Sequence, residues 1–369
     1  MELEQRLDAV VARAIAEDRI VGAVLLVRRD GKLIYETAQG LGDREAGKAM
    51  TVDTIFRLSS LTKPIVAATI LALVDDGKLR LDDRVSQFFP QFRPRLADGF
   101  APDITIHHLL THTSGLSTDS ILSAEERAAG INRWRLGTDE ILARLAALPL
   151  LYAPGSGWTY GPSLDVLGAL AGHIVGGSPE DAIRRHVTDP LGMIDSRFTV
   201  TDPTRLAAAY GDDSNGPVLM GDPHSVPSPF GTVTFDPGRI FDAEAFQAGG
   251  GGMAGTGPEF MALLEALRTG AGILKSETTR LGLADQIPQL RHAAGPGWSF
   301  SYFGAWLDDP TAADTPAPRG INRWGGIYGH NWFIDPLNKL SVVSMSNTGI
   351  EGCDGAYRHE ILRAVYAGL

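Results

Sequence analysis

The chain has 369 residues and a formal net charge of −11, with 44% hydrophobic and 21% charged residues. This length is too great for one small core and suits two packed domains or one large elaborated domain. The acidic balance argues against a nucleic-acid partner, which would need a basic surface.

The sequence also bears on location. A single cysteine, Cys353, excludes an internal disulfide, so nothing demands an oxidising compartment. The opening stretch MELEQRLDAVVARAIAEDR carries charges throughout and lacks the basic-then-apolar order of a signal peptide. No apolar run reaches membrane-spanning length. We therefore expect a cytoplasmic protein without a membrane partner, whose oligomeric state the sequence does not give.

The N-terminal region predicts a helix, a hairpin and a buried helix, in that order. Apolar residues repeat at helical spacing in the first segment: Leu7, Val10, Val11, Ala14 and Ile15. Residues 22–37, GAVLLVRRDGKLIYET, then predict two strands joined by an Asp30-Gly31 turn. From Pro64 to Val74 the chain is apolar on every side, which indicates a fully buried helix, and Gly77 is a natural stop.

The rest of the chain suggests how the fold is assembled. Residues 79–240 predict short helices joined by Pro- and Gly-rich loops, and three strand-like stretches follow: GWSFSYFGAWLDDP, GGIYGHNWFIDP and LSVVSMSN. A last helix carries Ile361, Leu362, Val365 and Leu369 on one stripe. We expect an α+β fold whose antiparallel sheet is flanked by the terminal helices. The expected domains are 1–80 with 240–369, and a mostly helical 81–239, with the active site between them.

Ser60 and Lys63 are the first candidates for chemistry. Three residues apart, they share one face of a helix, and Pro64 confines Ser60 to the first turn, where backbone N–H groups are unpaired. A lysine at the head of an apolar helix needs a polar cavity, because burying its charge is costly. Chance alone could also produce this spacing, and Tyr160, taken without the other motifs, is better interpreted as an aromatic that packs beside a loop.

Three short motifs in a fixed order resemble one family. SLTK, residues 60–63, is similar to the S-x-x-K box of serine β-lactamases, penicillin-binding proteins and family VIII carboxylesterases. YAPGSGWTYGP resembles the second box and places Tyr160 at its tyrosine, and RWGGIYGH supplies Trp324, Gly325 and Gly326 as the third. The third string resembles EstB-type esterases in particular, and the resemblance covers nearly the whole chain. It implies a β-lactamase-like fold.

The resemblance also implies roles for these residues. Ser60 would be the nucleophile, Tyr160 the general base and acid, and Lys63 its electrostatic partner and proton relay. Which of Lys63 and Tyr160 takes the first proton stays open. The oxyanion would be bound by the backbone N–H groups of Ser60 and Ile327. The remaining expected substrate contacts come from the third box and its neighbourhood: Trp324, Gly325, Gly326, Tyr328 and His330. For His330, packing is as good an interpretation, and Trp332 is a further candidate for the pocket wall.

Two departures from the family pattern matter. The second box ends in Pro162, which offers no side-chain hydrogen bond, so Ser163 or Asp165 is expected to replace the missing polar group near Lys63. The third box has Trp324 where a β-lactamase has a lysine that recognises the carboxylate of the drug. An indole carries no charge for that purpose. We therefore predict ester hydrolysis through an acyl-serine, with weak or no β-lactam hydrolysis. The family resemblance and the aromatic residues of the third box imply that the substrates are short-chain carboxylic esters.

Other functions were weighed against this prediction. No G-x-S-x-G string indicates an α/β-hydrolase. His107, His108 and His112 include one helical spacing suited to zinc, but no H-E-x-x-H motif or nearby acidic ligand accompanies them, so no metal and no organic cofactor are expected. The alternatives left open are a β-lactamase, DD-peptidase or amide hydrolase, an acyltransferase on the same scaffold, and a non-catalytic penicillin-recognising protein.

Overall fold

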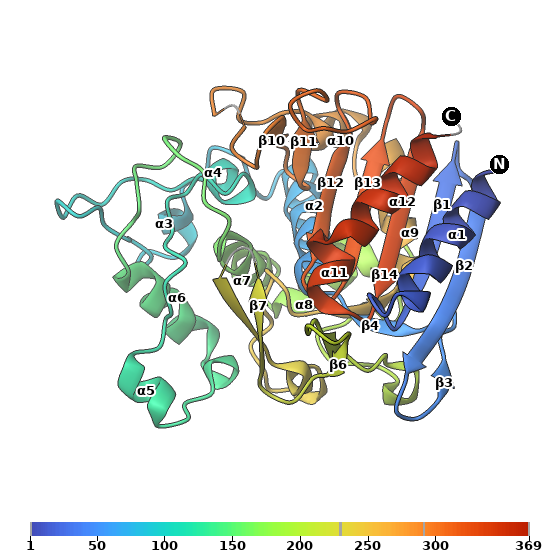
Figure 1. Ribbon diagram of the computed structural model, residues 1–369. Helices are drawn as coiled ribbons and strands as arrows, with labels where there is room; N and C mark the ends of the chain where they lie inside the picture. The colour runs from blue at the N-terminus through green and yellow to red at the C-terminus, as the bar shows by residue number, and fades with distance from the viewer. Residues whose placement is uncertain (1, 229–230, 291, 368–369) are drawn as a thin grey trace.

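The computed structural model describes residues 2–228, 231–290 and 292–367. Within them the main sheet has eight strands in the order β10-β11-β12-β13-β14-β1-β2-β3, and all neighbouring strands are antiparallel (Figure 1). Their bounds are β1 Gly22–Arg29, β2 Lys32–Asp43, β3 Lys48–Ala49, β10 Trp298–Phe300, β11 Ala305–Leu307, β12 Asn322–Gly326, β13 His330–Asp335 and β14 Leu340–Ser346. The α+β fold class is confirmed.

The two ends of the chain meet at the centre of this sheet. Strand β1 pairs with β14 from Ala23 opposite Ser346 to Arg29 opposite Leu340, and with β2 on its other edge. The predicted hairpin is confirmed. Asp30 and Gly31 both have positive φ, 49° and 78°, as a two-residue turn between right-twisted strands requires.

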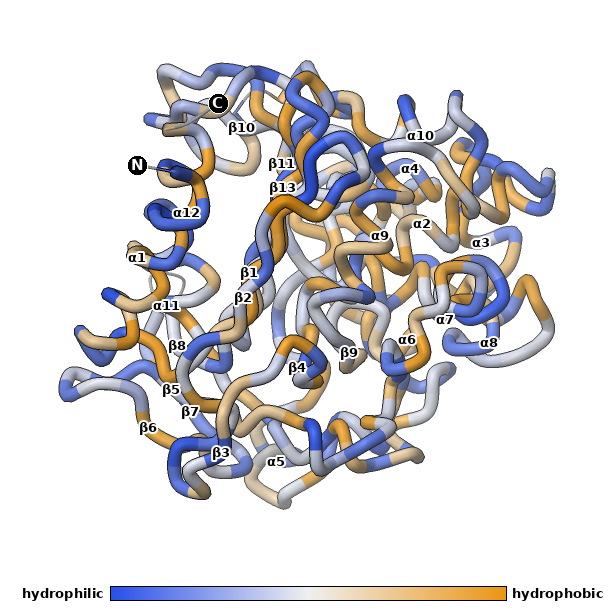
Figure 2. Tube along the Cα trace, turned by 90° about the vertical axis from the view of Figure 1, so that its right-hand side faces the viewer, coloured by the Kyte–Doolittle hydropathy of each residue, from blue (hydrophilic) through white to orange (hydrophobic). Residues whose placement is uncertain are grey.

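Terminal helices cover one face of the sheet. Helices α1 (Leu3–Ala16) and α12 (Ala356–Tyr366) lie side by side in Figure 2. Their apolar stripes and the strands beneath them form one core cluster, which includes Leu7, Val11, Leu25, Val342, Ile361 and Val365. Alternation along β1 sends Leu25 to this face and Val24 and Leu26 to the other.

The opposite face is covered by α2 (Thr62–Asp75), α9 (Gly257–Thr269) and α10 (Ser276–Leu283). Helix α2 is buried from Thr62 to Leu73, as its all-apolar sequence predicts, and the chain leaves it through Gly77 at φ 69°. Its burial includes Lys63, with 9% of its surface exposed, so the polar end of this helix needs partners.

The three strand-like stretches near the C-terminus form five strands, so the expectation of three was too low. The first folds back between β10 and β11, where Ser301 and Gly304 close a turn through their backbones. The second starts within β12 and continues as β13, after a turn that contains Gly329 at φ 119°. Aromatic residues on both sides of each turn conceal the break in the sequence pattern.

The regular elements in the middle of the chain are mainly short helices. Its elements are α3 Val85–Phe88, α4 Ile106–Leu110, α5 Ala124–Ala128, α6 Thr138–Ala147, α7 Ser163–Val175, α8 Pro179–Ile183 and the short strands β5 Tyr210–Gly211, β6 Val218–Leu219, β7 His224–Ser228 and β8 Gly231–Phe235. The pair β4 (Ile55–Arg57) and β9 (Ala254–Thr256) and the helical turn α11 (Gly349–Asp354) complete the fold. The domain boundaries stay a prediction. None of the helices in the described ranges combines the length and apolarity needed to cross a membrane.

Candidate active site

Ser60 lies in a 3₁₀ turn, η1 (Ser59–Leu61), that runs directly into α2. Ser59 has a φ of 48°, a left-handed conformation that is uncommon for a residue other than glycine and that the surrounding structure must hold in place. The turn leaves Ser60 only partly buried, whereas Ser59 and Leu61 are buried. The nucleophile candidate is therefore accessible at the head of a buried helix.

Two predicted side chains, those of Lys63 and Tyr160, contact Ser60 Oγ. The ammonium of Lys63 donates to Ser60 Oγ at 3.1 Å, and the hydroxyl of Tyr160 lies 2.7 Å from the same oxygen. Lys63 Nζ also lies 4.4 Å from the centre of the Tyr160 ring. Residues 100 positions apart in the sequence thus form one hydrogen-bonded group, which fits the requirement that a serine nucleophile have a base within reach.

Tyr160 is held by His112, which the sequence did not single out as a site residue. The backbone N–H of Thr159 donates to the His112 carbonyl at 3.0 Å, and the two rings lie 4.8 Å apart. Burial lowers the pKa of His112 well below its usual value, and the charge of Lys63 lowers it further. The neutral imidazole accepts the N–H of Gly161 through Nδ1 at 3.5 Å. In the sequence, the position of His112 within THTSGL was the signal that could have indicated a role near the site.

Trp324 also holds Tyr160. Its indole Nε1–H donates to the Tyr160 hydroxyl oxygen at 3.0 Å, and its ring packs edge-on against Phe300. An N–H donor at this position stabilises negative charge on the phenolic oxygen. Trp324, expected to bind substrate, is therefore placed where it acts on Tyr160.

We expect Trp324→Phe to lower kcat by about 10- to 100-fold, because a hydrogen bond to a charged group contributes about 1.5–3 kcal/mol. The phenyl ring keeps the packing against Phe300 but removes the donor. Steady-state rates on an activated ester test this, with the melting temperature as a check on folding. An unchanged kcat in a folded variant would contradict it.

Asp165 and Lys63 both bond to Gly250, through the two successive peptide groups of that residue. Lys63 Nζ donates to the carbonyl of Gly250 at 2.6 Å, and the N–H of the same residue donates to Asp165 Oδ1 at 2.7 Å. A Cβ at Gly250 would lie 3.1 Å from that carboxylate oxygen, which favours glycine there. Burial raises the pKa of Asp165, while the Gly250 hydrogen bond and Lys63 oppose the rise. Ser163, the other candidate, is bonded instead to Ser114 Oγ at 3.1 Å.

For Asp165→Asn we expect kcat/KM to fall about tenfold at neutral pH, because the neutral amide removes a negative charge that interacts with the Lys63 ammonium. Since the raised pKa means that the folded protein holds this proton more tightly than the unfolded chain, the ionised carboxylate lowers stability at pH values above that pKa. The variant should therefore melt no lower than the wild type at pH 7. Its acidic limb in the pH–rate profile should shift; an unchanged rate and profile would count against this role.

Lys63 and Tyr160 line a cavity of about 560 Å³. Its lining residues include Lys63 from α2, Tyr160 and Asp165 from the middle of the chain, and Ile327 and Tyr328 after β12. This volume is typical of a site for a small molecule. Lys63 and Tyr160 line this cavity and both contact Ser60 Oγ, so a candidate nucleophile and groups that can move its proton lie at the edge of the cavity.

The profile of the beta-lactamase family matches residues 7–366. The chain belongs to the beta-lactamase family. Among curated relatives, Esterase EstB of Burkholderia gladioli is 46% identical, over 99% of this chain and 95% of its own length. Lovastatin esterase of Penicillium rubens is 26% identical, over 97% and 98%. The solved structure of EstCE1, described as a hydrolase with promiscuous acyltransferase activity, has a TM-score of 0.94 at 40% identity, covering 99% of this chain and 98% of that one.

Two glycines of the third box, Gly325 and Gly326, allow other parts of this beta-lactamase-family protein to approach the backbone closely. A Cβ at Gly326 would lie 2.5 Å from the Leu58 carbonyl oxygen, so only glycine lets β12 pass this close to the turn that carries Ser60. At Gly325 a Cβ would meet Cys353 Sγ at 2.8 Å, on the α11 side, which is away from the cavity. The two glycines therefore set the position of the strand and the direction of the chain towards Ile327.

The structure does not bring His330 or Trp332 into the cavity. His330 is 1% exposed; its Nε2 bonds to the Arg57 carbonyl at 2.8 Å and its ring packs edge-on against Phe56. Trp332 is buried against Phe260. Both lie on β13, an interior strand with helices on both faces, so their side chains are buried in the packing between sheet and helices. Tyr328, outside the strand, does line the cavity.

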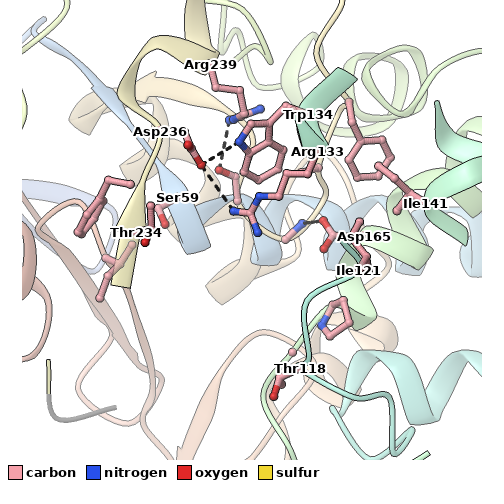
Figure 3. A pocket seen from close by; sticks show the side chains of 18 of the residues that line it. Ser59, Thr118, Ile121, Arg133, Trp134, Ile141, Asp165, Thr234, Asp236 and Arg239 are labelled. Carbon is pink, nitrogen blue, oxygen red and sulfur yellow. Dashed lines mark hydrogen bonds and ion pairs between the residues drawn. The ribbon is translucent and has the colours of Figure 1, made fainter. Parts of the chain in front are cut away.

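A charged and aromatic wall of the cavity was missed by the sequence analysis. Arg133, Trp134 and Arg239 gather around Asp236 in Figure 3. Trp134 Nε1 donates to Asp236 Oδ2 at 2.9 Å, and Arg133 lies 3.7 Å from the same carboxylate. These residues come from two 3₁₀ turns in irregular segments, η2 (Arg133–Arg135) and η5 (Pro237–Phe241), or next to one. No periodic pattern or motif marks them.

The three histidines considered for zinc have separate surroundings. His107 Nδ1 lies 2.8 Å from the Tyr302 hydroxyl, and His108 Nδ1 accepts the backbone N–H of Thr105. His112 packs against Tyr160. Across the described residues no three His, Cys, Asp or Glu side chains are grouped so that they could hold a metal ion.

Proposed function

We propose that this chain is a serine carboxylesterase that hydrolyses short-chain carboxylic esters through an acyl-Ser60 intermediate. One observation carries the proposal: the hydroxyl of Tyr160 and the ammonium of Lys63 lie 2.7 and 3.1 Å from Ser60 Oγ, beside a cavity of about 560 Å³. The esterase names of the relatives support it.

In the first half-reaction Ser60 Oγ attacks the ester carbonyl carbon while its proton passes to Tyr160, with Lys63 as electrostatic partner and relay. The carbonyl oxygen becomes an oxyanion, which we assign to the backbone N–H groups of Ser60 and Ile327. Collapse of this intermediate breaks the bond to the alcohol oxygen, which takes the proton from Tyr160. Acyl-Ser60 remains.

In the second half-reaction a water attacks the acyl carbonyl and gives its proton to Tyr160. The bond to Ser60 Oγ breaks, the serine recovers its proton, and the carboxylic acid leaves. Trp324 supports both steps, because its N–H bonds to the phenolic oxygen that carries the charge. Asp165 supports them through Gly250, whose N–H bonds to the Asp165 carboxylate and whose carbonyl accepts from Lys63.

An acyltransferase is the second candidate. In it an alcohol replaces water in the second half-reaction, and the description of EstCE1 as a hydrolase with promiscuous acyltransferase activity favours it. Adding methanol to the ester assay and measuring methyl ester among the products separates the two. The substrate in either case is a small-molecule ester. A cytoplasmic location remains a proposal that rests on the single cysteine.

The test is a comparison of substrate classes. We expect p-nitrophenyl butyrate to be turned over faster than p-nitrophenyl octanoate, and nitrocefin much more slowly than either, because Trp324 carries no charge for a β-lactam carboxylate. The Ser60→Ala variant supplies the background rate. Nitrocefin turnover near that of the butyrate would contradict the ranking. Equal rates for wild type and Ser60→Ala, together with no labelling by a fluorophosphonate, would instead favour a binding protein.

A further inference from the structure

The cavity beside Ser60 carries more positive charge than the rest of the molecule would suggest. Its charged lining residues are Arg57, Lys63, Arg133 and Arg239 against Asp119, Asp165 and Asp236. The whole chain, by contrast, has a formal charge of −11. A concave surface of positive sign concentrates anionic ligands.

Two of these arginines have no carboxylate partner in the described part of the chain. Arg57 donates to the carbonyls of Pro237 and Ala207, both at 2.9 Å. Arg239 donates to the carbonyls of Gly252 at 2.5 Å and Gly251 at 3.5 Å. Each forms hydrogen bonds to neutral backbone groups only. Arg133, in contrast, has Asp236 at 3.7 Å.

Burial without an ion pair is costly for a guanidinium. It lowers the pKa of Arg57 and of Arg239, with Tyr328 and more distant carboxylates opposing the effect only in part. Both groups nevertheless stay charged at neutral pH. Arg57 Nη2 and Arg239 Nη1 form no hydrogen bond to the described residues, and neither nitrogen is among the atoms sealed from solvent. Each arginine therefore keeps N–H donors free for a ligand.

The two arginines lie close to the reacting group. Arg57 ends β4, three residues before Ser60, and is tied to Pro237, two residues before Arg239. Arg239 is anchored on Gly251 and Gly252, directly after the glycine whose carbonyl holds Lys63. Burial raises the pKa of Tyr328, and the charges of Arg57 and Arg239 both oppose this rise. In the described residues neither arginine forms a hydrogen bond to Trp324, the residue at the position of the third-box lysine.

We infer that Arg57 and Arg239 bind a carboxylate carried by the substrate, so that the preferred esters are anionic ones such as half-esters of short dicarboxylic acids. This deepens the proposed function and rests on it. A planar fork of N–H donors matches a carboxylate, and the bond is stronger where water is largely excluded. The carboxylate belongs to the acyl part or to the alcohol part of the ester.

The first experiment compares charged and neutral esters that share the same carbon framework around the scissile bond. On the acyl side, monoethyl glutarate is compared with ethyl pentanoate; on the alcohol side, 4-acetoxybenzoate is compared with its methyl ester, following phenol release. We expect kcat/KM to be about tenfold or more higher for the charged member of one pair, as for one hydrogen bond between charged groups. The pair that shows the preference identifies which part carries the carboxylate, and added salt should reduce it.

The second experiment assigns the preference to the arginines. Arg57→Gln and Arg239→Gln should each reduce the charged-to-neutral ratio of kcat/KM about tenfold. Arg239→Lys keeps the charge but loses the planar fork of N–H donors. Its charged-to-neutral ratio should lie between those of Arg239→Gln and the wild type. Arg185→Gln, which removes a charge from an exposed position, is the matched control and should leave the ratio as it is. Calorimetry on Ser60→Ala measures binding of monoethyl glutarate and ethyl pentanoate without turnover.

The outcomes separate the two levels of the proposal. If neutral esters are hydrolysed in a Ser60-dependent manner but neither charged ester is favoured, the carboxylate site is wrong and the esterase stands. A preference that survives both glutamine variants overturns the assignment to these arginines. No Ser60-dependent hydrolysis of any ester overturns the proposed function. Tighter binding of monoethyl glutarate to Ser60→Ala would in that case still support the anion site.

Discussion

Ser60→Ala is expected to lower kcat/KM for p-nitrophenyl butyrate by about 10⁴-fold or more, since removing the nucleophile of an acyl-transfer enzyme removes the covalent route as a whole. The methyl side chain also leaves Tyr160 and Lys63 without the oxygen that both contact, at 2.7 and 3.1 Å. The residual rate would come from the oxyanion donors and the cavity alone.

The measurement for this variant combines rates with labelling. Intact-protein mass spectrometry after a fluorophosphonate should show one added group on the wild type and none on Ser60→Ala, and circular dichroism should show the same fold. Labelling that persists at full stoichiometry in the variant would place the nucleophile elsewhere. The result also bears on Lys63, because an amine acting as nucleophile would remain in the variant.

Tyr160→Phe is expected to lower kcat by about 10³-fold, within the range in which positioned acid–base groups contribute. The phenyl ring keeps the packing against His112 and Trp324, whose ring centres lie 4.8 and 5.0 Å away, and only the hydroxyl is lost. In the proposed mechanism both the attack and the departure of the alcohol use that hydroxyl, so acylation and deacylation should slow together.

Tyr302→Phe is the matched control for this change. It also removes a phenolic hydroxyl from a tyrosine that is 4% exposed, but this hydroxyl lies 2.8 Å from His107 Nδ1 and does not contact Ser60. We expect it to affect the melting temperature more than kcat. A loss of kcat in Tyr302→Phe as large as that in Tyr160→Phe would indicate a general effect of losing a buried hydroxyl.

The parts that the sequence predicted well are those where one residue type had a local physical requirement. The Asp30-Gly31 turn needs positive φ, the run from Pro64 to Val74 has no polar face to expose, and Ser60 and Lys63 are brought together by helical spacing alone. Tyr160 was assigned by its motif, because no local rule links it to a serine 100 residues away.

The parts that were missed depend on tertiary contacts. His330 and Trp332 carry the same aromatic and polar features as Tyr328, but only the sheet order shows that β13 is an interior strand where they are buried. Arg57 and Arg239 lie in unrelated segments without a motif, and their shared cavity appears only when β4 and η5 are placed side by side. Trp324 was expected to face substrate, and its bond to Tyr160 depends on a rotamer that sequence does not encode.

The pairing of β1 with β14 has a consequence for synthesis on the ribosome. Residues 22–29, which form β1, are synthesised early. One edge of β1 stays unpaired until residues 340–346, which form β14, have been synthesised. Throughout most of translation an apolar strand with free backbone groups is therefore exposed, a condition that favours aggregation. A nascent chain that stops short of its last forty residues would lack the centre of its sheet, even though Ser60, Lys63 and Tyr160 would all have been made.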